Sequence, residues 1–249
     1  MKTLRSFEIL DYLKDKKHCS MSELMEEFKV SPATIHRDIS YLARKNLIQK
    51  VRGGVAIASK TPTTQTERQL NSKFTSRMAQ NIEKKSVIAE SAASYICDGD
   101  IIFLDSSTTA LCLARKIQKM NLSNLTIITN SVLIIQEFHL FPPHFVLISL
   151  GGNFNCQLNS FLGKTTIENL KRLKIDKAFF SAVGITERGL TTFHENHSEF
   201  LQQALTLAEK NLLMIDSSKF GKSGIFDICP LDKIDHFVSD QNMPEYAKR

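Results

Sequence analysis

The sequence lacks the features that mark membrane, secreted and zinc-binding proteins. No apolar run approaches the roughly 18 residues of a membrane helix, and the first residues lack the apolar core of a signal peptide. The cysteines stand far apart, with no CxxC pair, which fits reduced thiols better than disulfides or a zinc site. We therefore expect a cytoplasmic protein with no membrane partner. The five cysteines are Cys19, Cys97, Cys112, Cys156 and Cys229.

Motifs for nucleotides, metals and cofactors are also missing or incomplete. No Gly-x-Gly-x-x-Gly follows an expected strand. Residues 216–223, DSSKFGKS, end like a phosphate-binding P-loop but have Asp216 where the first glycine must stand. Residues 194–199, HENHSE, contain metal-ligand side chains but miss the HExxH spacing by one residue, which favours a solvated loop. The sequence predicts no cofactor, no metal site and no catalytic residue.

The excess positive charge is concentrated in one short stretch. The 249 residues carry a net charge of +6. Residues 31–60 hold six basic side chains and one acidic side chain, for a net charge of +5, whereas residues 1–30 hold six of each. A polyanionic partner that contacts residues 31–60 is therefore expected.

This basic stretch has the pattern of a helix-turn-helix. Residues 20–23 read SMSE, a capping box that predicts a helix through Phe28. A second helix is predicted from Ser31 as N-cap, with Pro32 at its first position. Ile35, Ile39 and Leu42 form its apolar stripe, and the opposite face is polar and basic. Taken alone, this pattern is equally typical of an ordinary amphipathic helix with a solvated polar face.

A predicted β-hairpin follows the second helix. In residues 47–57, LIQKVRGGVAI, two β-prone segments flank Gly53 and Gly54, and paired glycines supply the positive φ that a tight turn requires. A helix-turn-helix followed by a hairpin indicates a winged DNA-binding domain. The first turns of the second helix are expected to contact base edges, and the basic residues after them phosphates. His36 has a second interpretation, as a half-buried helix residue. The DNA-contact candidates are Ser31, Ala33, Thr34, His36, Arg37, Ser40, Arg44, Lys45, Lys50 and Arg52.

The rest of the chain alternates apolar strands with amphipathic helices. Strands that are apolar throughout indicate a mostly parallel, Rossmann-like α/β sheet covered on both faces. The expected domains are 1–57 for DNA binding, 58–73 as a polar linker and 74–249 for the α/β domain. The strands are predicted at 101–105, 125–129, 145–152, 177–185, 212–216 and 235–240, and the helices at 109–117, 131–138, 165–173 and 198–210.

Ligands of such folds bind beyond the carboxyl ends of the strands. Residues 103–111, FLDSSTTAL, place four hydroxyl side chains between a strand and a helix, where they and free backbone N–H groups can bind an anion. An N-cap with additional hydroxyls is the simpler alternative. Lys219 follows another buried strand and can neutralise a phosphate. The candidate ligand residues are Asp105, Ser106, Ser107, Thr108, Thr109, Thr129, Asn130, Gly152, Gly184 and Lys219.

Seven runs follow one another along the chain: SPATIHRDISYL, KVRGGVAI, DGDIIFLDSSTTALCLA, LTIITNS, LGGNF, DKAFFSAVGI and IDSSKFG. In this order they resemble the DeoR-type bacterial transcriptional regulators over nearly the full chain. The resemblance implies a winged helix-turn-helix and a sensor domain similar to ribose-5-phosphate isomerase. It implies a repressor of a sugar-utilisation operon that leaves operator DNA when a phosphorylated sugar binds. On this basis we expect a homodimer or homotetramer, with residues 105–109, Asn130 and Lys219 in the effector site.

Three positions depart from the family pattern, and two alternatives stay open. His36 stands where arginine is usual, Ser107 where glycine is common, and Gln202-Gln203 where relatives often carry Lys-Arg. The first alternative is a sugar-phosphate isomerase-like enzyme with a nucleic-acid-binding head. It would need a general base near the phosphate loop. Asp105 and Asp216 are available, but the strand end at 181–184 offers no carboxylate. The second is an activator instead of a repressor.

Overall fold

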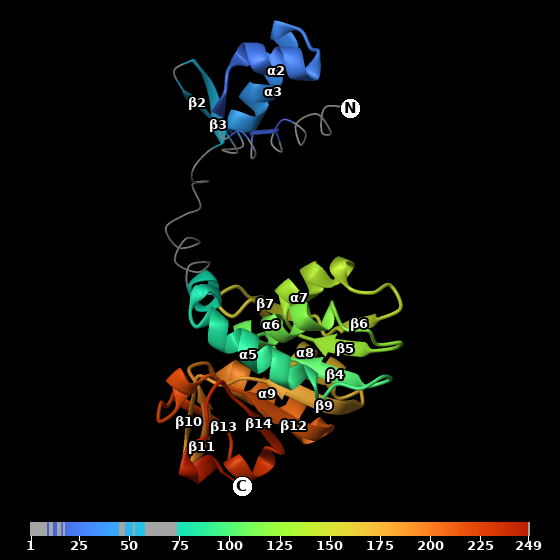
Figure 1. Ribbon diagram of the computed structural model, residues 1–249, viewed down its shortest axis with the longest axis vertical. Helices are drawn as coiled ribbons and strands as arrows, with labels where there is room; N and C mark the ends of the chain where they lie inside the picture. Colours follow the sequence, from blue (N-terminus) through green and yellow to red (C-terminus); the bar gives the residue numbers. More distant parts are fainter. Residues whose placement is uncertain are drawn as a thin grey trace. The chain divides into compact units, whose positions relative to one another are not determined.

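The computed structural model describes residues 18–44, 48–51, 53–57 and 74–248, with Ile9, Tyr12, Leu13 and Lys16 before them (Figure 1). The chain divides into two compact units, Met1–Arg68 and Gln69–Arg249. The predicted linker at 58–73, like Lys45 and Arg52, lies outside the described residues.

Two helices of the first unit begin where the sequence predicts. Helix α2 (Met21–Phe28) starts at Ser20, whose Oγ accepts a hydrogen bond from the Glu23 N–H at 3.1 Å, while the Glu23 carboxylate accepts one from the Ser20 N–H at 2.7 Å. The predicted capping box is thereby confirmed. The helix ends at Lys29, which has a left-handed backbone with φ 49°. Two residues, Val30 and Ser31, separate Lys29 from helix α3 (Pro32–Arg44).

The two faces of α3 differ as its sequence pattern predicts. Ile35, Ile39 and Leu42 are buried and pack in one core with Leu24 of α2. The residues of the other face are exposed or half-buried. Exposed are Ser31, Ala33, His36 and Arg37, and half-buried are Thr34 and Ser40. The exposure of His36 contradicts its interpretation as a half-buried helix residue.

The hairpin belongs to a three-stranded antiparallel sheet in the order β1-β3-β2. Its strands are β1 (His18–Cys19), β2 (Ile48–Val51) and β3 (Gly54–Ile57). The sequence did not predict β1, which pairs with β3 through Cys19 and Val55. Of the two turn glycines, Gly53 has a positive φ, at 91°, and Gly54 does not. The expectation for Gly54 was wrong: glycine is needed there because a Cβ would lie 2.2 Å from the Cys19 carbonyl oxygen.

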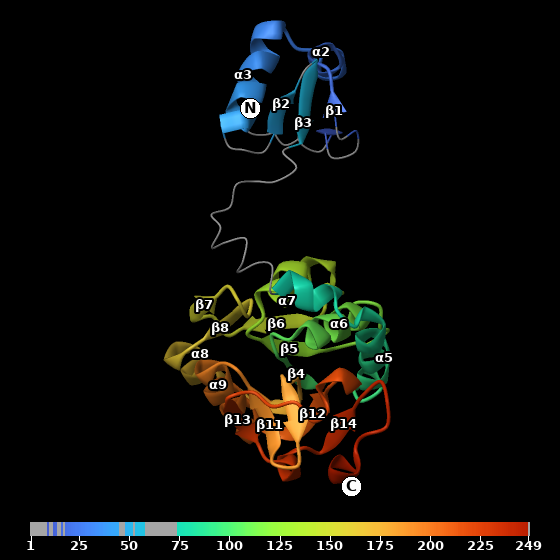
Figure 2. The same cartoon turned by 90° about the vertical axis from the view of Figure 1, so that its left-hand side faces the viewer.

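The second unit is built on a six-stranded sheet in which every pairing is parallel, in the order β14-β12-β9-β4-β5-β6 (Figure 2). The predicted α/β fold class is therefore confirmed. The strands are β4 (Ile101–Leu104), β5 (Thr126–Thr129), β6 (Val146–Ser149), β9 (Ile175–Phe180), β12 (Ala208–Met214) and β14 (His236–Val238).

Helices cover both faces of this sheet. Ile102 and Leu104 of β4 pack in the cluster that contains buried residues of α5 and α6, whereas Phe103 between them packs in the cluster of α8 and α9. Because successive strand residues point to opposite faces, a strand covered on both sides is apolar throughout. The helices are α5 (Ile82–Ala93), α6 (Thr108–Ile117), α7 (Val132–Glu137), α8 (Lys164–Leu170) and α9 (Glu195–Leu207), with short 3₁₀ turns η1 (Phe138–Leu140), η2 (Ser217–Lys219), η3 (Leu231–Lys233) and η4 (Glu245–Ala247).

Short antiparallel elements interrupt the predicted alternation. The expected strand 177–185 ends at Phe180, and the expected helix 198–210 ends at Leu207 because residues 208–210 pair with β9 in the sheet. The elements that the sequence did not predict are the hairpin of β7 (Asn153–Asn155) and β8 (Ser160–Leu162), and the sheet of β10 (Gly184–Thr186), β11 (Gly189–Thr192) and β13 (Phe226–Cys229).

Replacing Gly54 by alanine should destabilise the first unit by about 1–3 kcal/mol, because the added methyl group collides with backbone instead of a flexible side chain. Thermal unfolding of the full chain, followed by circular dichroism and calorimetry, measures this change. The transition of the second unit is the internal control. An unchanged first-unit transition would show that β1 does not depend on this close approach.

Candidate functional site

A cavity of about 1080 Å³ lies at the carboxyl ends of three neighbouring strands of the large sheet. Its lining includes residues 106–108 after β4, 181–183 after β9, and Asp216, Ser218 and Lys219 after β12. Because parallel strands end at the same edge of a sheet, these distant segments meet there. The sequence predicted this edge, and of the predicted ligand residues Ser106, Ser107, Thr108 and Lys219 line the cavity.

Asp105 organises the loop beneath the cavity instead of facing into it. Its carboxylate is fully buried and accepts hydrogen bonds from the Ser107 N–H at 3.0 Å and the Ser181 N–H at 3.1 Å. Burial raises the pKa of Asp105 to about 6, against the opposing effect of these hydrogen bonds and of Lys219. The carboxylate therefore connects the loops that follow β4 and β9.

The loop after β4 presents the start of α6 to the cavity. Ser107 is the N-cap, and its Oγ accepts a hydrogen bond from the Ala110 N–H at 3.0 Å. The N–H groups of Thr108 and Thr109 precede the first intrahelical hydrogen bond, so the helix itself does not use them. With the hydroxyl groups of Ser106 and Thr108, this first turn can bind an anion.

Lys219 brings a cation to the same cavity. Its Nζ donates a hydrogen bond to Ser181 Oγ at 3.1 Å and lies 3.9 Å from an Asp216 carboxylate oxygen. Burial lowers the pKa of Lys219 to about 8, and the nearby Asp216 and Asp105 oppose this shift. A bound anion would favour the charged form of this lysine.

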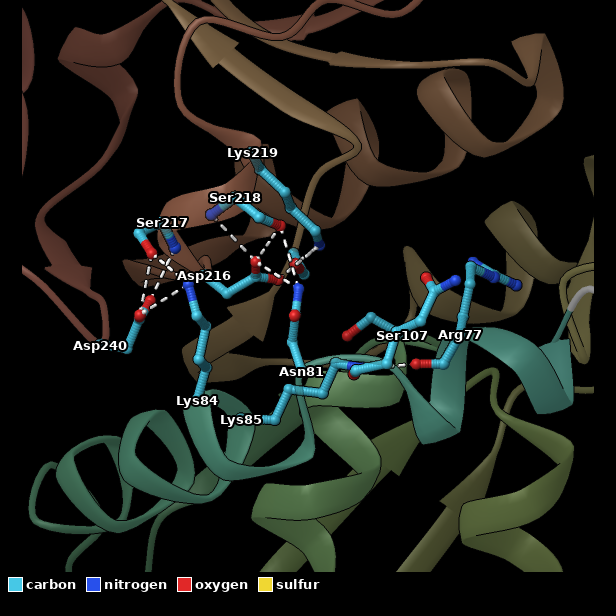
Figure 3. Close-up of polar contacts among 12 residues, drawn as sticks. Arg77, Asn81, Lys84, Lys85, Ser107, Asp216, Ser217, Ser218, Lys219 and Asp240 are labelled. Atoms are coloured by element: carbon cyan, nitrogen blue, oxygen red, sulfur yellow. Dashed lines mark hydrogen bonds and ion pairs between the residues drawn. The ribbon is translucent and has the colours of Figure 1, made fainter.

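The segment before and within α5 forms a wall that the sequence did not identify. Asn81 donates hydrogen bonds to Asp216 Oδ1 at 3.1 Å and to Ser218 Oγ at 3.0 Å (Figure 3). The buried Lys85 donates to the carbonyl oxygens of Arg77 and Gln80, at 2.6 Å for the latter. Local sequence gave no signal for the Asn81 contacts, because they join segments that are far apart in the chain. The Lys85 contacts are local, but they depend on how the chain turns before α5.

Two cations of this wall are not neutralised by carboxylates. Arg77 donates a hydrogen bond to the Gln157 carbonyl oxygen at 3.1 Å, and burial lowers the pKa values of both Arg77 and Lys85. Within the described part of the chain, neither forms an ion pair with Asp or Glu. Among the described residues, four Lys or Arg side chains and one carboxylate, that of Asp216, line the cavity, so this lining favours an anionic ligand. The basic residues are Arg77, Lys85, Lys219 and Lys222.

A further wall comes from the connection between β11 and α9. Thr192, Phe193, His194 and His197 line the cavity there, and His197 Nδ1 lies 3.2 Å from Thr192 Oγ1. Burial lowers the pKa of His197 to about 4, with smaller contributions from His194 and Arg77, so the imidazole is neutral at pH 7. The prediction of a solvated loop at 194–199 was wrong, because α9 begins at Glu195.

Thr109, Thr129 and Asn130 lie outside the cavity lining, although the sequence placed them among the ligand residues. Thr109 is buried in the first turn of α6. Thr129 Oγ1 donates to the Leu104 carbonyl oxygen at 2.7 Å, and Asn130 Nδ2 donates to Ser160 Oγ at 2.8 Å. The last two side chains therefore connect neighbouring segments, and direct contact of any of the three with a ligand is not supported.

Gly152 and Gly184 also lie outside the lining. A Cβ on Gly152 would be 2.0 Å from Thr166 Oγ1, and one on Gly184 would be 2.0 Å from the Lys222 carbonyl oxygen. Both glycines are explained by close packing of the chain, since a side chain would displace a neighbouring segment.

The candidate DNA-contact residues lie on the exposed face of α3 and on the hairpin. Arg37 and His36 are exposed on α3, and Lys50 is exposed on β2. Arg44 ends α3, whereas the predictions for Lys45 and Arg52 fall outside the described residues. The described residues thus include exposed side chains of α3 and an exposed lysine of the hairpin in the same unit.

The described residues contain neither a candidate metal site nor a candidate membrane-spanning helix. They contain no group of three or more His, Cys, Asp or Glu side chains arranged to hold a metal ion. The helices of the described segments are too short or too polar to cross a membrane.

Two family models match this chain in the same order as its two units. The DeoR-like helix-turn-helix domain matches residues 5–61, and the DeoR C terminal sensor domain matches residues 80–241. The chain belongs to the DeoR family. Its place in that family makes it a DNA-binding transcriptional regulator with a sensor domain, and the sequence resemblance is confirmed.

Similar DeoR-family proteins match nearly the whole chain. The HTH-type transcriptional regulator IolR of Bacillus subtilis is 33% identical over 98% of this chain and 94% of that protein. The glycerol-3-phosphate regulon repressor of Escherichia coli is 28% identical over 97% and 92%. The lactose phosphotransferase system repressor of Staphylococcus epidermidis is 33% identical over 89% and 85%. These relatives are named as regulators of transcription, which supports the regulator over the enzyme alternative.

Solved structures match this DeoR-family chain less closely. Ribose 5-phosphate isomerase A of Methanocaldococcus jannaschii is 19% identical, with a TM-score of 0.40 over 57% of this chain and 55% of that chain. The translation initiation factor eIF-2B of Pyrococcus horikoshii is 16% identical, with a TM-score of 0.47 over 93% and 82%.

The lowered pKa of Lys219 predicts a pH-dependent affinity for phosphate. Between about pH 7.5 and 9.5 a phosphate monoester stays dianionic, because its second pKa is about 6, while Lys219 loses its proton around pH 8 in the free protein. Binding then requires proton uptake, and affinity should fall by up to about tenfold per pH unit above the pKa. Isothermal titration calorimetry with glycerol 3-phosphate, a phosphate monoester, measures this dependence.

A Lys219→Arg variant is the matched control, because arginine stays charged throughout this range. It should bind glycerol 3-phosphate with little dependence on pH. Equal pH dependence in both proteins would show that another group takes up the proton.

Proposed function

We propose that this DeoR-family protein represses a sugar-utilisation operon and leaves its operator when a phosphorylated sugar binds in the cavity of the second unit. One observation carries the effector part of the proposal. In the described part of the chain, the cavity has four basic lining residues against one carboxylate, together with the free N–H groups of the first turn of α6. Such a lining suits a compact anion with more than one charge.

The carbohydrate part of the proposal is supported by the size and lining of the cavity. A volume of about 1080 Å³ is far larger than a phosphate ion needs. Hydroxyl, amide and imidazole side chains, which can hydrogen bond to a sugar, share the lining with the cations. The names of two relatives, the glycerol-3-phosphate regulon repressor and the lactose phosphotransferase system repressor, fit this class of ligand.

For operator DNA, we assign base contacts to α3 and phosphate contacts to the residues after it. The major groove admits a helix, and Arg37 is the best candidate for a guanine because its guanidinium can donate two hydrogen bonds to one base. Lys50 would neutralise a phosphate, as we expect for Arg44, Lys45 and Arg52. The candidate base-contact residues are Ser31, Ala33, Thr34, His36, Arg37 and Ser40.

The position of the cavity wall in the chain suggests how release could occur. Residues 76–85 line the cavity at several positions, and they are the part of the second unit that follows the linker from the DNA-binding unit. A ligand that contacts this segment can favour one arrangement of the chain over another, limited by its difference in affinity for the two. We expect a homodimer or homotetramer in the cytoplasm, because two DNA-binding units can occupy the two halves of an operator.

Arg37→Ala should abolish specific operator binding while Lys50→Ala weakens binding to all sequences about equally. Gel-shift titrations on the gene's own upstream region and on a scrambled duplex, at several salt concentrations, measure both effects. The Lys50 variant should also reduce the salt slope by about 1. Retained specificity in the Arg37 variant would refute the assignment of α3 to base contacts.

Lys219→Ala should leave operator binding unchanged and weaken release by phosphorylated sugars by about tenfold or more, because a charged partner of the phosphate is lost. Lys164→Ala is the matched control, since that lysine is exposed and outside the cavity. Operator release is titrated with glycerol 3-phosphate, ribose 5-phosphate, glucose 6-phosphate and fructose 6-phosphate. Unchanged release in the Lys219 variant would exclude this cavity as the effector site.

A further inference from the structure

The wall between β11 and α9 differs chemically from the cationic walls. It contributes Thr192, the aromatic ring of Phe193 and the imidazoles of His194 and His197. Thr192 is 1% exposed, whereas Phe193 is 52% exposed. A cavity with lysine and arginine side chains on some walls, and hydroxyl, aromatic and imidazole groups on another, suits a ligand with an anionic part and a polar, uncharged part.

The imidazole of His197 has a defined orientation in this wall. Its Nδ1 lies 3.2 Å from Thr192 Oγ1. The backbone of Thr192 is itself fixed, because its carbonyl oxygen accepts a hydrogen bond from the Ile225 N–H at 2.9 Å. The backbone N–H of His197 donates to the His194 carbonyl oxygen at 3.2 Å, in the first turn of α9. A ring positioned in advance loses little freedom when it binds a ligand.

The charge state of His197 separates its role from that of the lysines. With a pKa of about 4, the ring is neutral at pH 7 and offers one donor and one acceptor nitrogen. A neutral imidazole contributes no charge toward a phosphate, but it can hydrogen bond to a hydroxyl group in either direction. The neighbouring Phe193 ring gives an apolar surface against which the C–H groups of a sugar can pack.

We infer that His197, oriented by Thr192 and flanked by Phe193, selects the effector by its carbohydrate part: it hydrogen bonds to a sugar hydroxyl while the cationic walls bind the phosphate. This inference rests on the proposed function. It assigns affinity for the phosphate and choice among sugars to different residues, so the two properties can be changed separately by mutation.

The test compares full-length wild-type protein with His197→Ala and His197→Phe by isothermal titration calorimetry. The probes are inorganic phosphate, glycerol 3-phosphate, ribose 5-phosphate, glucose 6-phosphate and fructose 6-phosphate. Both variants should bind the preferred sugar phosphate about tenfold more weakly, as expected for one lost hydrogen bond, and bind inorganic phosphate within about twofold of wild type. The phenylalanine variant keeps the ring and shows whether the nitrogen atoms cause the loss.

Two control variants complete the design. His139→Ala removes an exposed histidine outside the cavity and should change nothing. Lys219→Ala should weaken inorganic phosphate and sugar phosphates alike. Melting temperatures confirm that each variant is folded before binding is compared.

The outcomes separate this inference from the proposed function. A wild-type protein that binds no sugar phosphate more tightly than inorganic phosphate refutes the proposed function and the inference together. Selective sugar-phosphate binding that both His197 variants retain refutes the inference alone. Equal weakening of phosphate and sugar phosphate in these variants also refutes it, because His197 would then support the cavity instead of selecting the sugar.

Discussion

The arrangement of the sensor cavity depends on the buried carboxylate of Asp105. Its two oxygens accept hydrogen bonds from the backbone of Ser107, in its own loop, and of Ser181, after the neighbouring strand β9. Ser107 caps α6, and Ser181 accepts a hydrogen bond from Lys219. One carboxylate thus fixes the backbone at the start of α6. Through Ser181 it also helps to position Lys219. Burial raises its pKa to about 6, so the fold accepts an electrostatic cost to obtain this order.

Similar polar contacts attach η2 to helix α5. Asp240 accepts hydrogen bonds from the Ser217 N–H at 2.6 Å and the Ser217 hydroxyl at 2.9 Å, and Lys84 donates to the same hydroxyl at 2.7 Å (Figure 3). Asn81 adds its contact with Asp216. Because these groups are polar and partly buried, each stays favourable only while its partner is in place. The wall formed by residues 76–85 and the loop that carries Lys219 are therefore expected to move as a coupled pair.

Local sequence patterns were sufficient for the elements that local interactions determine. The capping box at Ser20, the apolar stripe of α3 and the apolar β4 each follow from residues close together in the chain. The same reasoning extended the helix that ends at Leu207 by three residues, because pairing with β9 overrides a helical pattern. This reasoning missed three residues of the cavity wall. Arg77 and Asn81 contact segments that lie 80 and 135 residues away in the chain. Lys85 contacts the backbone of the turn before α5.

The cations of the cavity carry an electrostatic cost that can favour the binding of an anion. Arg77 and Lys85 are largely enclosed without a carboxylate partner, and burial lowers the pKa of each. In a protein that is only marginally stable, uncompensated buried charge is costly. The anionic ligand that we propose would offset that cost in an arrangement that brings these cations together. The unfavourable charge would then increase the difference in ligand affinity between two arrangements of the chain. This difference sets the upper limit on how strongly a ligand can shift the chain from one arrangement to the other.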